Sequence, residues 1–221
     1  MGQAIGAILG QAVGVAISPV PIIAVILMLF SKGSKINSIS FLVGWIVGLL
    51  GVGMIVLALG IASSDGAPST ASGWIKTLIG ALFIVLGFKQ WKSRPKKGES
   101  AAMPKWMSSI DEFTAVKSLG LGLLLAGVNP KNLGLTISAA AAIGSAGLSS
   151  GDEAVVLVVY VVLASLTIAA PVILNLVMGS KATHTLTEMK EWLTDNNATV
   201  MTVLFIVLGA KVLGDGISII A

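Results

Sequence analysis

The sequence predicts an all-α integral membrane protein with six transmembrane helices, arranged as two inverted repeats of three helices each. The first observation is the composition, because 55% of the 221 residues are hydrophobic and only 11% are charged, whereas soluble domains average about 25% charged residues. The second is a set of six apolar runs near the roughly 20 residues that a bilayer core requires. The third is a proline motif that recurs in the first and fourth runs.

The six apolar runs predict the transmembrane helices in chain order. Their expected bounds are Ala4–Phe30, Ile39–Ala62, Gly73–Phe88, Leu119–Ala146, Ala154–Met178 and Ala198–Ile220. The chain then divides into a first three-helix repeat (residues 1–91), a basic cytosolic linker (92–116) and a second three-helix repeat (117–221).

Two polar segments predict amphipathic helices, which either lie in the membrane interface or cap the helix bundle. In the linker the apolar face comprises Met103, Trp106, Met107, Ile110 and Phe113. Before the sixth run, a similar face comprises Leu186, Met189 and Leu193, flanked by Trp192.

The basic residues predict the orientation of the chain in its membrane. Eleven of the 14 Lys and Arg residues fall in the first, third and fifth loops, and loops rich in Lys and Arg remain in the cytosol. Both termini are therefore expected outside. The net charge of +4 follows from this loop bias, so it does not indicate binding of nucleic acid.

Two pairs of matching segments indicate the internal repeat. Residues 82–89 read LFIVLGFK and residues 204–211 read LFIVLGAK, while the first and fourth runs carry ISPVPI (17–22) and VNPKNL (128–133). Because each unit holds three spans, the second unit must enter the membrane from the opposite face. Inverted repeats of this kind are a transporter architecture, with a site near the midplane where broken helices meet.

The proline motifs predict a broken helix and a binding site. Proline removes a backbone hydrogen bond and favours a helix restart, and the amides at a helix start attract anions. Ser18 and Asn129 are expected to cap the restarted helices. The expected substrate-binding residues are Ser18, Pro19, Pro21, Asn129, Pro130, Lys131 and Asn132. The alternative is that the prolines only kink their helices.

Lys131 strengthens the expectation of an anion site. A lysine at the bilayer centre costs roughly 2.5–3.5 kcal/mol on insertion scales. An acidic partner, water or a bound anionic group must offset that cost. If no carboxylate pairs with Lys131, a negatively charged substrate group is its expected partner.

A second charged pair lies in the sixth run. Lys211 and Asp215 are four residues apart and therefore share one face of a helix. They form either a local ion pair near the outer end of the span or a site of ion or proton coupling. The sequence offers no catalytic residues, and its single His and absent Cys predict neither a metal site nor a cofactor. We therefore expect no enzyme.

The sequence resembles the LysE superfamily of small bacterial exporters, through Ser18–Pro19–Pro21 in the first span and Asn129–Pro130–Lys131 in the fourth. Within it, the chain is most similar to the GAP family of glycolipid- or sulfolipid-addressing proteins, through DEFTAVKSLGLGLLLAGVNPKNLGL (111–135) and VLGAKVLGDGI (207–217). The resemblance implies a protein of the bacterial cytoplasmic (inner) membrane that helps to move a lipid or glycolipid to the outer leaflet or the periplasm. The first motif departs from the PGP of the amino-acid exporters, which favours a more hydrophobic cargo.

Three hypotheses about function follow. The first is a transporter that exports or translocates an anionic lipid or glycolipid through an anion-binding site at the midplane. The second is a membrane scaffold that joins lipid-synthesis or export machinery through its basic loop, and the third is an exporter of amino acids or small cations. The glycine-rich helix faces are also compatible with a homodimer.

Overall fold

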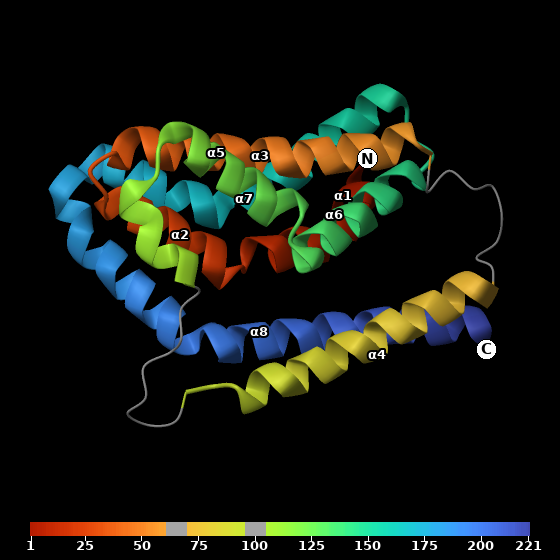
Figure 1. Ribbon diagram of the computed structural model, residues 1–221. Helices are drawn as coiled ribbons and strands as arrows, with labels where there is room; N and C mark the ends of the chain where they lie inside the picture. The colour runs from red at the N-terminus through yellow and green to blue at the C-terminus, as the bar shows by residue number, and fades with distance from the viewer. Residues whose placement is uncertain (61–69, 96–104) are drawn as a thin grey trace. The chain divides into compact units, whose positions relative to one another are not determined.

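The computed structural model describes residues 1–60, 70–95 and 105–221, without the side chains of residues 71, 72, 75, 76 and 105. Every regular element in this part of the chain is a helix, which confirms the all-α class. In chain order (Figure 1) the helices are α1 (Gly2–Ala16), α2 (Pro19–Phe30), α3 (Ser34–Ala58), α4 (Thr70–Lys92), the 3₁₀ helix η1 (Lys105–Glu112), α5 (Ala115–Gly127), α6 (Pro130–Gly144), α7 (Ser150–Met178), the 3₁₀ helix η2 (Gly179–Ala182) and α8 (Thr183–Ile220).

Among the described residues, two segments are long and apolar enough to cross a membrane: α3, and the stretch from Ser150 to Ile220 that contains α7, η2 and α8. A third span is obtained if α1 and α2, which are bent by 54° at their break, count as one. The short apolar helix α5 has 13 residues, fewer than the roughly 20 that a bilayer core requires. The helices are thus compatible with a membrane protein, and the number of six spans remains a prediction.

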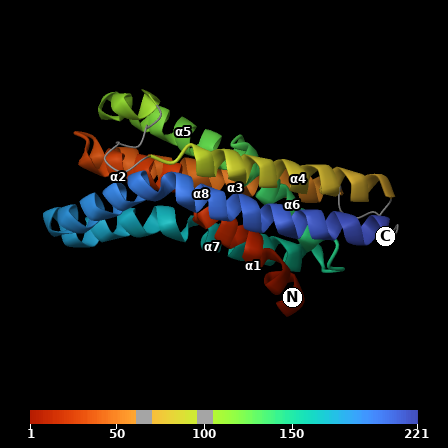
Figure 2. The ribbon, with the colours of Figure 1, turned by 90° about the horizontal axis from the view of Figure 1, so that it is seen from below.

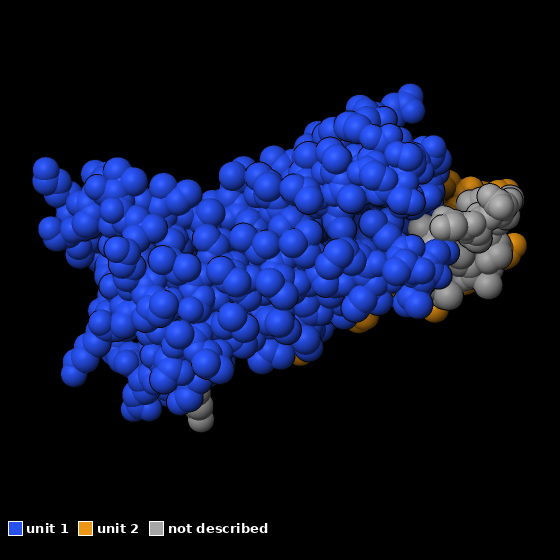
Figure 3. Space-filling model, turned by 90° about the horizontal axis from the view of Figure 1, so that it is seen from above, with its two compact units in different colours: residues 1–64, 103–191 blue, residues 65–102, 192–221 orange. Residues whose placement is uncertain are grey.

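The chain divides into two compact units (Figure 3). Unit 1 consists of residues 1–64 and 103–191, and unit 2 consists of residues 65–102 and 192–221. Each unit takes segments from both halves of the chain: unit 1 contains α1 to α3 and α5 to α7, and unit 2 contains α4 and the last part of α8. The repeat boundaries proposed from the sequence remain a prediction.

In unit 1, the helices α3 and α5 touch through glycine. A Cβ atom added at Gly44 would overlap the backbone carbonyl group of Leu119, and one added at Gly122 would overlap that of Phe41. Glycine therefore allows the two backbones to approach closely, as small residues do between membrane helices. On the other side of the unit, α1 packs against α6 and α7.

In unit 2, α4 and the last part of α8 lie side by side in both views (Figure 1 and Figure 2) and make reciprocal contacts. A Cβ atom added at Gly87 would lie 2.9 Å from the side chain of Ile206, and one added at Gly209 would lie 2.9 Å from that of Ile84. The two glycines occupy the same position in the repeated segment, and so do the two isoleucines. Such exchanged contacts are what a local twofold axis produces.

An aromatic pair obeys the same relationship. Phe83 and Phe205, which also occupy equivalent positions of the repeated segment, have ring centroids 5.6 Å apart. Tilted aromatic pairs at this separation are favourable beyond their buried area. The two copies of the segment therefore pack on each other.

The two segments with predicted amphipathic helices differ in outcome. In the linker, Met107 and Ile110 of η1 are only 4% and 1% exposed, and η1 packs against α2. This supports the interpretation that the linker helix caps the helix bundle. Met103 lies outside the described residues. The segment before the sixth span is not a separate helix, because α8 runs without a break from Thr183 to Ile220. No glycine or proline between Thr183 and Ala198 ends the helix.

Some sequence-based expectations fall on residues outside the described part of the chain. One is the expected end of the second span at Ala62. The others are Lys96 and Lys97, which belong to the eleven basic residues counted in the loops, and the side chain of Lys105, which belongs to the same eleven.

Candidate functional site at two broken helices

Both proline motifs break their helices, as predicted. The structure has α1 and α2 on either side of the first motif, and α5 and α6 on either side of the second. Ser18 and Asn129, which precede Pro19 and Pro130, leave the helical conformation with ψ angles of 96° and 119°. The cause is local, because a proline ring disfavours the α conformation of the residue before it.

Lys131 is buried in unit 1, and its ammonium group reaches the C-terminal end of α1. The residue is 5% exposed. Its Nζ atom donates to the carbonyl oxygen of Gly14 at 2.7 Å, to the hydroxyl of Ser18 at 2.7 Å and to the carbonyl oxygen of Ile17 at 3.4 Å. An ammonium group has three N–H donors, so each one has a partner.

These partners differ from the acidic residue or bound anion that the sequence led us to consider. Among the residues that the structure describes, no carboxylate lies within ion-pair distance of Lys131. The C-terminal end of a helix carries a partial negative charge. The carbonyl end of α1 therefore offsets part of the cost of burying this cation.

The last four carbonyl groups of a helix have no partner within it. At the end of α1 these are the carbonyls of Gly14 to Ala16 and of the C-cap residue Ile17, and all four are hydrogen-bonded. The Gly14 and Ile17 carbonyls bind the ammonium group of Lys131. The Val15 carbonyl accepts a hydrogen bond from the Ser18 hydroxyl at 2.7 Å, and the Ala16 carbonyl accepts one from the Thr167 hydroxyl at 2.6 Å. The break in the first span is thus satisfied by side chains from α6 and α7 as well as its own serine.

Asn132 performs the same task at the end of α5. This fully buried residue donates from Nδ2 to the carbonyl oxygen of Leu125 at 2.8 Å, and its Oδ1 atom lies 3.2 Å from the Ser18 hydroxyl oxygen. Two consecutive side chains of α6 therefore bind the carbonyl ends of both preceding half-helices. Ser18 contacts both of them, so Ser18, Lys131 and Asn132 form one buried polar cluster.

The amino ends of the restarted helices differ from each other. Asn129 caps α6 as predicted, because its Oδ1 atom accepts from the backbone N–H of Lys131 at 3.1 Å. The cap predicted for Ser18 is wrong: its side chain makes no capping bond to α2, since its hydroxyl is bonded within the cluster.

The prolines also differ in their surroundings. Pro19 and Pro21 are buried, whereas Pro130 is exposed. Proline has no backbone N–H, so only one of the first three residues of α2 retains an amide donor. The start of α2 therefore offers an anion fewer donors than an ordinary helix start.

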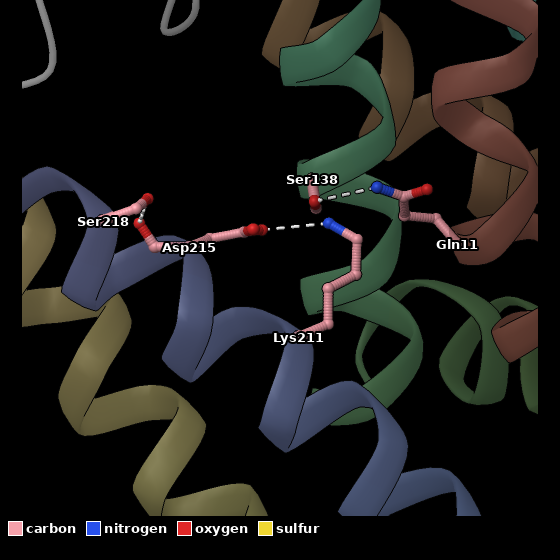
Figure 4. Close-up of polar contacts among 5 residues, drawn as sticks. All are labelled: Gln11, Ser138, Lys211, Asp215 and Ser218. Atoms are coloured by element: carbon pink, nitrogen blue, oxygen red, sulfur yellow. Dashed lines mark hydrogen bonds and ion pairs between the residues drawn. The ribbon is translucent and has the colours of Figure 1, made fainter.

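Lys211 and Asp215 form an ion pair within unit 2 (Figure 4). Their side chains are 2.9 Å apart and 62% and 50% exposed, as expected of a local pair one helical turn apart. Their role in coupling remains a prediction. Figure 4 also shows a bond within unit 1, from the Gln11 amide to the Ser138 hydroxyl at 3.4 Å, which links α1 to α6.

Sequence reasoning missed three hydroxyl groups. Thr167 binds the end of α1, as described above, while the Thr136 hydroxyl lies 2.9 Å from that of Tyr160. Thr136 is 1% exposed and Tyr160 is 0% exposed. Isolated polar residues within apolar helices are the available signal, because their side chains form hydrogen bonds between membrane helices.

The fold and the site define an all-helical protein, compatible with a membrane, in which a buried lysine and asparagine bind the ends of two proline-broken helices. The chain belongs to the family of Sap, the sulfolipid-1-addressing protein, whose family model matches residues 8–218. That match covers both proline motifs and most of both compact units, and it confirms the expected Sap-type family. No curated protein and no solved structure matches the chain.

Proposed function

We propose that the protein is a LysE-type membrane transporter that exports or translocates an anionic lipid or glycolipid across the bacterial cytoplasmic membrane. The family supports the lipid class of the cargo, because its description is that of a protein that addresses a sulfolipid. The observation that carries the proposal is the buried ammonium group of Lys131 where two broken helices meet. Discontinuous helices supply the substrate sites of many secondary transporters.

The proposed site for the anionic headgroup is the pair of proline motifs. Lys131 supplies the positive charge, because the two prolines of α2 leave few amide donors there. In the state that the structure describes, carbonyl groups of α1 hold the ammonium group. A sulfate or phosphate headgroup binds by replacing these neutral oxygen acceptors with anionic ones, because a hydrogen bond between two opposite charges is stronger.

The proposed topology is that of a multi-pass protein with both termini outside and its two repeats inverted. The basic loops support the orientation, and the exchanged contacts between α4 and α8 support an internal twofold relation. The protein moves its cargo without altering it chemically, so we propose no enzymatic step. A homodimer and association with lipid-synthesis or export machinery stay predictions.

Purified protein in liposomes tests the proposal. A fluorescent sulfated glycolipid in one leaflet should reach the other in vesicles with the wild-type protein, and a zwitterionic phosphatidylcholine probe should move more slowly. Lys131→Ala should abolish the movement of the anionic probe. Lys117→Ala is the matched control, because Lys117 is exposed at the start of α5.

The outcomes separate the hypotheses. Size-exclusion chromatography and thermal unfolding establish that each variant is folded before the assay. Wild-type rates in folded Lys131→Ala would remove the site, since the headgroup would then not need this cation. If the wild-type protein moves no lipid without other proteins, the scaffold hypothesis replaces the transporter.

A further inference from the structure

The oxygen atoms around the Lys131 ammonium group have the chemistry of a cation site. They are the carbonyl oxygens of Gly14 and Ile17 and the hydroxyl oxygen of Ser18. All three are neutral acceptors, and two belong to the C-terminal end of a helix, where the helix dipole is negative. Carbonyl groups at the ends of unwound membrane helices coordinate Na⁺ or H⁺ in transporters.

We propose that these three oxygens form a binding site for a monovalent alkali cation, which the ammonium group of Lys131 occupies as an ion tethered to the chain. An ammonium group and K⁺ are similar in size, and both are bound by neutral oxygen atoms. The site has no carboxylate among the described residues, whereas divalent cations such as Ca²⁺ are bound with the help of carboxylates. The geometry therefore favours a single positive charge.

The burial of the site gives the cation a structural task. Gly14 and Ser18 are buried, and a buried acceptor that loses its partner destabilises the fold. When the ammonium group is withdrawn or removed, the buried oxygen atoms of Gly14 and Ser18 lose that partner, as does the carbonyl oxygen of Ile17, a residue that is 41% exposed. A free K⁺ or Na⁺ ion with part of its water shell can take the vacated position.

The tethered ion predicts two different salt responses. The wild-type protein needs no free cation here, because Lys131 provides the charge. A variant without the ammonium group should instead be stabilised by K⁺ or Na⁺, because a ligand that binds only the folded state raises its stability. This inference is independent of lipid export, since its test contains no transport substrate.

Thermal unfolding of the detergent-solubilised full chain tests the inference, in KCl, NaCl or choline chloride at equal ionic strength. The unfolding midpoint of Lys131→Ala should be higher in KCl or NaCl than in choline chloride, by about 2–4 °C or more for a chain of this size. The wild-type midpoint should be the same in all three salts. The double variant Lys131→Ala/Ser18→Ala should show a smaller shift, because one ligand is lost.

Three results would overturn the inference. The first is that the unfolding midpoint of Lys131→Ala is equal in the three salts. The second is that KCl or NaCl raises the unfolding midpoint of the wild-type protein, relative to choline chloride, as much as that of Lys131→Ala. If Lys131→Ala does not fold, Lys131→Gln is measured in the same way and judged by the same criteria, because its amide group still donates to one carbonyl. The third is that neither variant folds in any of the salts, because the free cation should then have stabilised the folded state.

Discussion

The ammonium group of Lys131 lies 2.7 Å from the carbonyl oxygen of Gly14, 117 residues earlier in the chain, and so ties the start of α6 to the end of α1. A buried charge without partners is costly, and so is a helix end with unbonded carbonyl groups inside a membrane protein. The carbonyl groups give the buried ammonium group its hydrogen-bond acceptors, and the ammonium group gives the carbonyl groups a donor. The broken helices and the buried lysine are therefore two parts of one arrangement.

Replacing Lys131 with methionine should destabilise the protein. Methionine retains the unbranched apolar stem of the side chain but lacks the terminal ammonium group, so the Gly14 and Ile17 carbonyl groups are left unbonded. We expect the free energy of unfolding to fall by about 1–3 kcal/mol, because removal of the buried charge offsets part of the loss. Denaturant titration of the purified protein measures the change.

Lys211→Met is the control for this prediction. Lys211 belongs to an exposed ion pair one turn apart on α8, and such pairs contribute about 0.3–0.5 kcal/mol. If Lys211→Met lowered the free energy of unfolding as much as Lys131→Met, the effect would follow from replacing any lysine of the chain and not from the buried cluster.

Two glycines of α5 should respond oppositely to alanine. A Cβ atom at Gly122 would overlap the backbone of Phe41 on α3, whereas one at Gly120 would meet nothing within 4 Å. We expect Gly122→Ala to lower the free energy of unfolding by about 1–3 kcal/mol through overpacking. Gly120→Ala should raise it by up to about 1 kcal/mol, because alanine favours the helix.

Thermal unfolding of the two glycine variants checks this order. Equal unfolding midpoints would contradict the close approach of α3 and α5.

Single cysteines should report the orientation of the chain, which has no cysteine of its own. Gly2→Cys and Ala221→Cys should react with a membrane-impermeant maleimide in intact cells, because both termini are predicted outside. Lys92→Cys should react only after the membrane is opened, since its loop is basic and expected in the cytosol. Labelling of one terminus only would require an odd number of spans and would contradict six.

The helix breaks could be predicted from the sequence because their cause is local. Ser18–Pro19 and Asn129–Pro130 place a polar residue before a proline, and both pairs interrupt a helix. Pro171 shows that proline alone is insufficient, since it lies inside α7 without interrupting it. The residue before it is Ala170, whose side chain offers the backbone no alternative hydrogen bond.

The partners of Lys131 could not be predicted, because they are mainly backbone carbonyl groups. Carbonyl groups are present at every residue, and only the fold decides which ones lack a partner. The sequence therefore predicted an acidic partner, water or a bound anionic group for Lys131, and not the carbonyl end of another helix. Asp215, an acidic residue within an expected span, pairs with Lys211 on its own helix.

The repeated segment was visible in the sequence, but its packing was not. The match between residues 82–89 and 204–211 predicted two equivalent helices. Their mutual contact depends on where Gly87 and Gly209 face, and each faces the isoleucine of the other copy. A sequence match shows equivalence of position, and only the fold shows that the equivalent helices touch.

The central claim is that Lys131 holds the broken ends together through the cluster, and a double-mutant cycle between Lys131→Met and Ser18→Ala tests it most directly. The two side chains are 2.7 Å apart, so their effects on the free energy of unfolding should differ from the sum by about 0.5–3 kcal/mol. Ser31→Ala is the control partner, because 12 residues of α2 at 1.5 Å each place Ser31 about 18 Å from Pro19.

The control cycle should be additive within about 0.3–0.5 kcal/mol. A coupling energy between Lys131 and Ser18 that clearly exceeds this value is the result we predict. Additive effects in both cycles would contradict the account, because the buried ammonium group would then not act through the cluster at the end of α1.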